Sequence, residues 1–168
     1  MIENPISGER IVICTSSEDS HGALLSFELY LPPGGHVPAR HVHPVQEERF
    51  TVIRGTWRFR LGRRTLVATA GQTVTVPPRT AHWFGNIGDT EAQARVEVRP
   101  ALRMEELLEA SESVGRAAQA AGRRLPRVRD LAVMLDEFER ELAVPLVPRG
   151  LVRWVLKPLA WFADGLAP

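Results

Sequence analysis

Short runs of alternating apolar and polar residues fill the first 100 positions of the chain. The clearest runs are 22–31, 56–61 and 92–98, and in each of them the apolar side chains recur at every second residue. In an extended strand this period places the apolar side chains on one face. Turn signals rich in Gly and Pro separate the runs, as at 32–35 and 86–89. The pattern predicts a β-sandwich or a small β-barrel over residues 1–100.

The pattern becomes helical after Pro100. Residues 104–121 are rich in Glu and Ala, and a second run that opens at Pro126 repeats its apolar residues at steps of four and three. We expect two amphipathic helices, the second continuing until the Pro-containing stretch 144–148 ends it. Residues 101–168 are therefore predicted to form a C-terminal helical extension that packs on the barrel or on a partner.

A third apolar segment covers residues 151–166 and contains Trp154, Trp161 and Phe162. Pro158 and several charges interrupt it, so the segment is unsuited to spanning a bilayer. We expect it to cover the protein's own barrel or a partner subunit. A membrane interface is the alternative surface, and we rank it last because the charge balance gives little attraction to anionic lipid.

Composition excludes several function classes. Lys and Arg number 21 against 20 Asp and Glu, and the net charge of +1 shows no footprint for nucleic acid. The lone Cys14 excludes a disulfide framework and a zinc cluster built on Cys. Lys157 is the only lysine, which argues against Schiff-base chemistry in the barrel. The polar start of the chain resembles no signal peptide, so we expect a cytoplasmic protein.

The chemistry of the sequence is concentrated in its histidines. His41 and His43 are separated by one residue, so on a strand both imidazoles project from the same face and can reach one ion. Beyond Pro44, Glu48 shares strand parity with Phe50 and Val52, which directs its carboxylate toward the core. An unpaired carboxylate in a core is costly, and a metal ion is one partner that it can have.

Two segments of the chain resemble the paired motifs of the cupin family. Residues 35–55 fit G-x5-H-x-H-x(3 or 4)-E-x6-G at every fixed position. Residues 71–86 fit G-x5-P-x-G-x2-H-x3-N except that Arg79 replaces the third fixed residue, glycine. Fifteen residues separate the two segments, a short spacing typical of small microbial cupins. The resemblance covers roughly residues 20–100 and leaves the helical extension unexplained.

The resemblance implies a mainly β fold, a double-stranded β-helix or jelly-roll barrel, with helices added at the C-terminus. It also implies that His41, His43, Glu48 and His82 converge on one divalent metal ion inside the barrel. Three imidazoles and a carboxylate accept Zn, Ni, Fe, Mn, Co or Cu, and the ligand types alone do not choose among them. At Arg79, a residue other than Gly at positive φ is disfavoured, so the turn before His82 is expected to differ slightly.

Other conspicuous residues have ordinary interpretations. We interpret His21 and His36 as structural or surface histidines and Trp57 as core. Trp83 and Phe84 point to opposite faces of a strand, so only one of them can face the barrel interior.

Such a barrel is compatible with three kinds of function. The first is a metal-dependent enzyme of oxygenase, isomerase or cyclase type that acts on a small organic molecule chelating the metal through oxygen. The alternative is a non-catalytic module that binds a small molecule or senses a metal. A DNA-binding regulator is disfavoured because neither predicted helix has a basic face. No catalytic residue beyond the metal ligands can be named from the sequence.

The apolar run 10–15 predicts how the barrel edge is protected. Exposed strand edges carry unpaired backbone groups and are usually covered. This run can pair with a sheet of its own chain or of a partner, and we expect a homodimer.

Overall fold

The computed structural model describes residues 1–145 and 150, and the described residues form nine strands followed by two helices. The strands are β1 (Ile2–Glu3), β2 (Arg10–Thr15), β3 (Leu25–Leu31), β4 (Glu47–Arg54), β5 (Trp57–Leu61), β6 (Arg64–Ala68), β7 (Thr73–Val76), β8 (His82–Asn86) and β9 (Ala92–Arg99). The helices are α1 (Met104–Ala120) and α2 (Val128–Glu137). The predicted runs of alternating polarity therefore became β3, β5 and β9.

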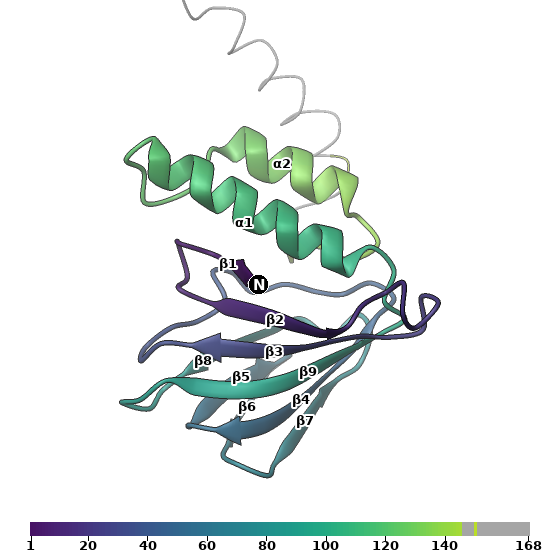
Figure 1. Ribbon diagram of the computed structural model, residues 1–168, viewed down its shortest axis with the longest axis vertical. Coiled ribbons are helices and arrows are strands. Elements are labelled where there is room, and N and C mark those ends of the chain that lie inside the picture. Colours follow the sequence, from purple (N-terminus) through teal and green to yellow (C-terminus); the bar gives the residue numbers. More distant parts are fainter. Residues whose placement is uncertain (146–149, 151–168) are drawn as a thin grey trace, which may run out of the picture.

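Two antiparallel sheets face each other to form the barrel. The larger sheet has the order β1-β2-β3-β9-β4-β7, and the smaller has the order β6-β5-β8. Figure 1 shows the larger sheet in front of the smaller one, with α1 and α2 lying along the β1 side. This arrangement is the double-stranded β-helix with C-terminal helices that the sequence predicts.

Alternation along the strands builds the barrel core. In β9 every second residue is buried, and its neighbour β3 buries the residues opposite them, as in the pair Phe27 and Val96. Four aromatic side chains meet between the sheets, with the Phe50 and Phe84 ring centroids 4.9 Å apart. The other two are Trp57 and Phe59, both fully buried. Trp57 is thus core, as predicted, and aromatic packing of this kind dominates the stability of a small core.

Gly55 has a position that excludes a side chain. Its φ of +84° lies in the left-handed region, and a Cβ there would come within 2.6 Å of the Ala92 Cβ. The last fixed glycine of the first motif therefore lets the β4–β5 turn pass closely over the start of β9.

The edge of the larger sheet is covered in part by the chain's own N-terminus. β1 pairs with Arg10 and Ile11 of β2, while β3 pairs with the other side of β2. Val12, on the outer face of β2, keeps 39% of its surface exposed. The apolar run 10–15 thus pairs within its own chain, and the homodimer stays a prediction.

The second helix is shorter than predicted. It ends at Glu137, although the apolar spacing that predicted it continues through Phe138 and Leu142. Phe138 is buried and Leu142 packs against the core from a turn that follows the helix, so both apolar residues have partners without a helical backbone. Beyond this turn, Ala143 pairs with Val42 in an isolated antiparallel bridge. A helix continued to residue 144 would forgo that pairing.

The apolar segment 151–166 lies outside the described residues. Among residues 1–145 and 150, no helix has both the length and the hydropathy needed to cross a bilayer.

Candidate metal centre

His41 and His82 face each other across a backbone pairing between the 35–46 segment and β8. The His41 amide donates to the His82 carbonyl at 3.0 Å, and the His82 amide donates to the His41 carbonyl at 2.8 Å. Residues that exchange both hydrogen bonds lie directly opposite, with their side chains on the same face. The two imidazole centroids are accordingly 4.1 Å apart.

Glu48 enters the same space from the opposite sheet. It is the second residue of β4, where Val76 and Val98 are its neighbours on either side. Its carboxylate is buried, as strand parity with Phe50 predicts. Glu48 Oε2 lies 3.0 Å from His82 Nε2 and 3.4 Å from His43 Nε2.

The structure brings together all four residues that the sequence singled out. One ligand atom from each of them lies within 4.8 Å of the others, and all four residues are buried. The donor set is His41, His43, Glu48 and His82. Neither His21 nor His36 belongs to the group, and both are exposed.

Each histidine turns its Nδ1 toward a backbone carbonyl and away from the other ligands. His41 Nδ1 lies 3.1 Å from the Ala39 oxygen, and His82 Nδ1 lies 3.1 Å from the Thr80 oxygen. His43 Nδ1 lies 2.6 Å from the oxygen of Glu141. A carbonyl can only accept, so each Nδ1 carries the proton and each neutral ring leaves Nε2 free as a ligand.

Three buried atoms at this point have no hydrogen-bond partner among the described residues. They are Nε2 of His43, Nε2 of His82 and Oε2 of Glu48. Leaving a buried polar atom unpaired costs about 1–3 kcal/mol each. Neutral imidazole nitrogens and a carboxylate oxygen are the donors that first-row divalent metals accept, so the residues fit a metal ion.

The pKa values of His41 and Glu48 are both lowered, which is the direction that metal binding requires. Burial lowers the pKa of His41 to about 3, and the neighbouring His82 and His43 add to the shift. Burial by itself would raise the pKa of Glu48, but the imidazoles of His43 and His82 beside its carboxylate bring it below its usual range. At neutral pH His41 is therefore a neutral donor and Glu48 an anion.

His43 behaves differently from His41. Burial by itself would lower its pKa, but the Glu48 carboxylate, together with the hydrogen bond to Glu141, raises it above the usual value. Below this raised pKa, a metal ion that binds His43 competes with a proton for Nε2.

Gln46 is a buried polar residue, two positions before Glu48, that the sequence analysis missed. It is fully buried, and its Nε2 donates to the carbonyls of Pro100 and Ala101 at 3.1 and 2.9 Å. Its Oε1 has no partner among the described residues. Gln46 shares strand parity with Glu48, so this inward position could have been found by extending the same alternation by two residues.

Glu9 is a second missed residue. It precedes β2 with the parity of Ile11, which is buried. Burial raises the pKa of its carboxyl, the Ser7 hydroxyl lowers it in part, and the charge of Glu48 raises it further. Glu9 as a whole is only partly buried, and it does not belong to the group of candidate ligands.

Arg79 keeps the backbone of the glycine that it replaces. Its φ is +64°, and its amide donates to the His43 carbonyl at 2.8 Å. We expected the turn to differ slightly because Arg79 replaces glycine. Arg79 nevertheless has the positive φ that glycine adopts readily. The turn thus ties the second motif to the first despite the conformational cost of a non-Gly residue at this φ.

The aromatic pair after His82 divides as parity predicts. Phe84 is buried and packs near His41, with ring centroids 6.3 Å apart. Trp83 is only partly buried and contacts the exposed His36 on the outer face, at 5.5 Å between centroids. Phe84 is the member of the pair that faces the barrel interior.

Comparison with known proteins identifies a domain within the chain. Residues 27–98 match the cupin domain, and this stretch includes both ligand segments. The chain therefore contains a cupin domain. No curated protein matches it in sequence.

Solved structures share its barrel. A predicted oxalate decarboxylase from Thermotoga maritima is 22% identical with a TM-score of 0.53, over 55% of this chain and 80% of that one. A Klebsiella pneumoniae protein with a double-stranded β-helix domain is 21% identical, with a TM-score of 0.50 over 56% and 78%. A cupin-like protein from Thermotoga maritima is 18% identical, with a TM-score of 0.50 over 58% and 72%. Likeness at these identities shows the fold alone.

Proposed function

We propose that the barrel binds one divalent metal ion through His41, His43, Glu48 and His82. The carrying observation is the convergence of four buried ligand atoms within 4.8 Å of one another. The unpaired Nε2 and Oε2 atoms support it, because metal binding would satisfy them together. The donor set suits Zn, Ni, Fe, Mn, Co or Cu.

We further propose that the metal-loaded protein is an enzyme acting on a small organic molecule that chelates through oxygen. A metal with four protein ligands can keep positions for water and substrate, and it supplies Lewis acidity or redox chemistry of the oxygenase, isomerase or cyclase type. The chain's own residues would shape the space around the substrate. Phe84 supplies an apolar wall beside His41.

Oxalate is a useful first probe of this substrate class. It is a small dicarboxylate that chelates through oxygen, and it appears in the name of the predicted oxalate decarboxylase that shares the fold. Turnover of such a probe would support the enzyme. Binding of ligands without turnover would favour the alternative, a non-catalytic module that binds a small molecule or senses a metal.

Elemental analysis tests the metal site. Protein purified without chelators or a metal-affinity tag should hold about one divalent metal ion per chain. After metal removal, calorimetric titration with Mn²⁺, Fe²⁺ or Zn²⁺ should show a single site. A purified and folded protein that neither holds nor takes up any of these ions would contradict the proposal.

We also propose a homodimer that uses the outer edge of β2. β1 pairs with two positions of β2 and leaves residues 12–15 without a strand on that side among the described residues. A second copy can cover this edge. Light scattering at micromolar concentration should give twice the chain mass, and a monomeric mass would contradict the dimer.

A further inference from the structure

The C-terminal extension reaches back to the segment that carries His41 and His43. The Val42 amide donates to the Ala143 carbonyl at 2.8 Å, and the Ala143 amide donates to the Val42 carbonyl at 2.9 Å. Val42 stands between the two histidines, and its neighbour His41 bonds β8 in the same way on the other side. The extension therefore adds a final strand-like contact to the edge of the smaller sheet.

The same stretch holds the ring of His43. His41 and His82 each place Nδ1 near the carbonyl of the residue two positions earlier. For His43 that carbonyl belongs to His41, and it already accepts the His82 amide. His43 instead donates to the Glu141 carbonyl, 98 positions away, at 2.6 Å. Of the three histidines, His43 alone takes its Nδ1 partner from outside the barrel.

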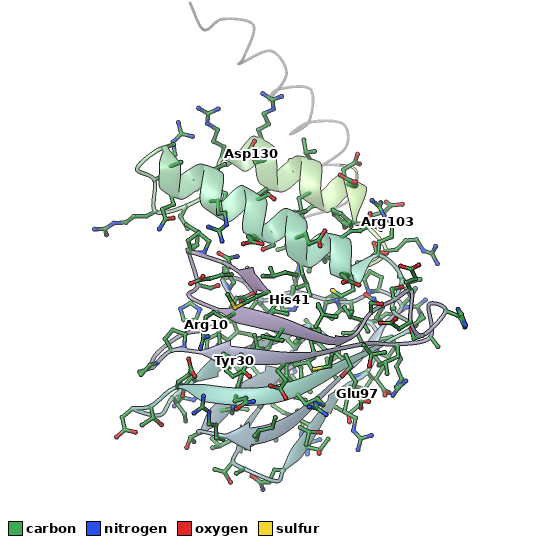
Figure 2. The ribbon with its side chains drawn as sticks, viewed as in Figure 1. Arg10, Tyr30, His41, Glu97, Arg103 and Asp130 are labelled. Carbon is green, nitrogen blue, oxygen red and sulfur yellow. The ribbon has the colours of Figure 1, made fainter. Side chains whose placement is uncertain are left out.

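The turn that presents the Glu141 carbonyl is itself fixed. The Glu141 side chain is 3% exposed, and its Oε1 accepts the Arg103 amide at 3.2 Å. The Glu141 amide donates to the Phe138 carbonyl at 3.0 Å. The Arg103 guanidinium lies 4.8 Å from the Phe138 ring centroid and pairs with Glu137. Figure 2 shows Arg103 at the end of α1 where the extension leaves the barrel.

We propose that residues 138–143, which we call the clamp, position His43 for metal binding. The clamp fixes the Nδ1–H tautomer and the ring orientation through Glu141, while the Ala143 pairing fixes the backbone beside His43. It touches no ligand atom that faces the metal, so Glu141 is a positioning residue. The inference rests on the proposed metal site. Hydrogen-bond partners of ligating histidines commonly change metal affinity about 10- to 100-fold.

A matched pair of variants at Ala143 tests the clamp in the full chain. Ala143→Pro removes the amide that donates to Val42, whereas Ala143→Ser keeps it. Calorimetric titration with Zn²⁺ should show about 10- to 100-fold weaker binding for Ala143→Pro and nearly unchanged binding for Ala143→Ser. Equal affinity in the two variants would overturn the proposal.

A double-mutant cycle with His43→Ala separates positioning from general loosening. If the clamp acts through His43, Ala143→Pro should cause little further loss of Zn²⁺ affinity in the His43→Ala background. Additive losses of affinity would overturn the proposal, because they would show that the clamp acts independently of His43. Visible absorption of bound Co²⁺ gives a second reading, since a misplaced His43 changes the ligand field.

A second pair keeps the test independent of the proline. Glu141→Ala removes the acceptor for the Arg103 amide, whereas Glu141→Gln retains an oxygen there. The alanine variant should weaken Zn²⁺ binding and the glutamine variant should not, and equal binding would count against the clamp.

If the parent chain binds no metal, the proposed function fails. In that case ¹⁵N NMR of the metal-free protein at alkaline pH tests the clamp by itself. His43 should be Nδ1-protonated in the parent and of mixed tautomer in Glu141→Ala, whereas an unchanged tautomer would overturn the proposal.

Discussion

The barrel and the C-terminal extension hold the histidines of the candidate site by different means. His41 and His82 use carbonyls two residues earlier in the chain, at Ala39 and Thr80. His43 uses the Glu141 carbonyl, which comes from beyond both helices. The first kind of support is contained in each ligand segment, whereas the second exists only when the extension is in place. A short motif can therefore specify a ligand without specifying everything that orients it.

The largest expected effect comes from removing a ligand on the barrel side. His82→Ala should weaken divalent-metal binding by more than about 100-fold, beyond the usual range for residues that only support a ligand. The barrel should remain folded, because its aromatic core lies in other side chains. Calorimetric titration and circular dichroism would check the two statements.

His36→Ala is the matched control for that experiment. His36 is exposed and lies outside the four-residue cluster, so its loss should leave metal affinity unchanged. Unchanged metal content in His82→Ala, with the same affinity as His36→Ala, would remove His82 from the ligand set.

An intermediate effect is expected from pH, and it separates His41 from His43. The native pKa of His41 is lowered from 6.5 to about 3, so between these values the unfolded chain binds a proton that the native state does not. Stability of the metal-free protein should therefore fall as pH falls through this window, by at most about 1.4 kcal/mol per pH unit from this residue. Urea unfolding of His41→Asn should show a weaker acid-side loss than the parent.

His43 should show the opposite sign. Its native pKa is raised above 6.5, so its stabilising contribution is complete below 6.5 and is lost as pH rises through the native value. His43→Asn should therefore reduce the loss of stability on the alkaline side and leave the acid side nearly as in the parent. Parallel pH profiles for the two variants would contradict these opposite shifts.

The smallest effect is expected at Arg79. Its left-handed backbone costs a non-Gly residue about 1–2 kcal/mol, and glycine would remove this cost while adding some conformational entropy to the unfolded chain. Arg79→Gly should therefore stabilise the protein by about 0.5–1 kcal/mol. Arg79→Ala, which keeps the strain, should give no such gain in thermal unfolding, and a gain equal to that of glycine would show that the side chain is responsible.

Much of the barrel was predictable because its signals are local. Strand alternation located β3, β5 and β9, and parity directed Glu48 inward. The two motifs predicted that His82 and His41 belong to one group of ligands, and the structure places these two residues together. Their role as metal ligands stays a prediction.

The unpredicted features depend on contacts between distant parts of the chain. The apolar period through Leu142 could not show that α2 ends at Glu137, because tertiary burial satisfies the same residues without a helix. Nothing near Glu141 indicates that its carbonyl meets His43, since any residue offers a carbonyl. Glu9 was overlooked for a different reason, because it stands one residue before the predicted strand.

The bond between His43 and Glu141 also orders events in time. Chains are synthesised from the N-terminus at about 5–20 residues per second, so the 59 positions between 82 and 141 take roughly 3–12 s. During that interval all four candidate ligands have been made, but the carbonyl that orients His43 has not. A metal ion captured on the nascent chain would meet a loosely held His43, and one captured later would meet a fixed ring. Synthesis of the extension therefore sets the earliest moment at which the complete site exists.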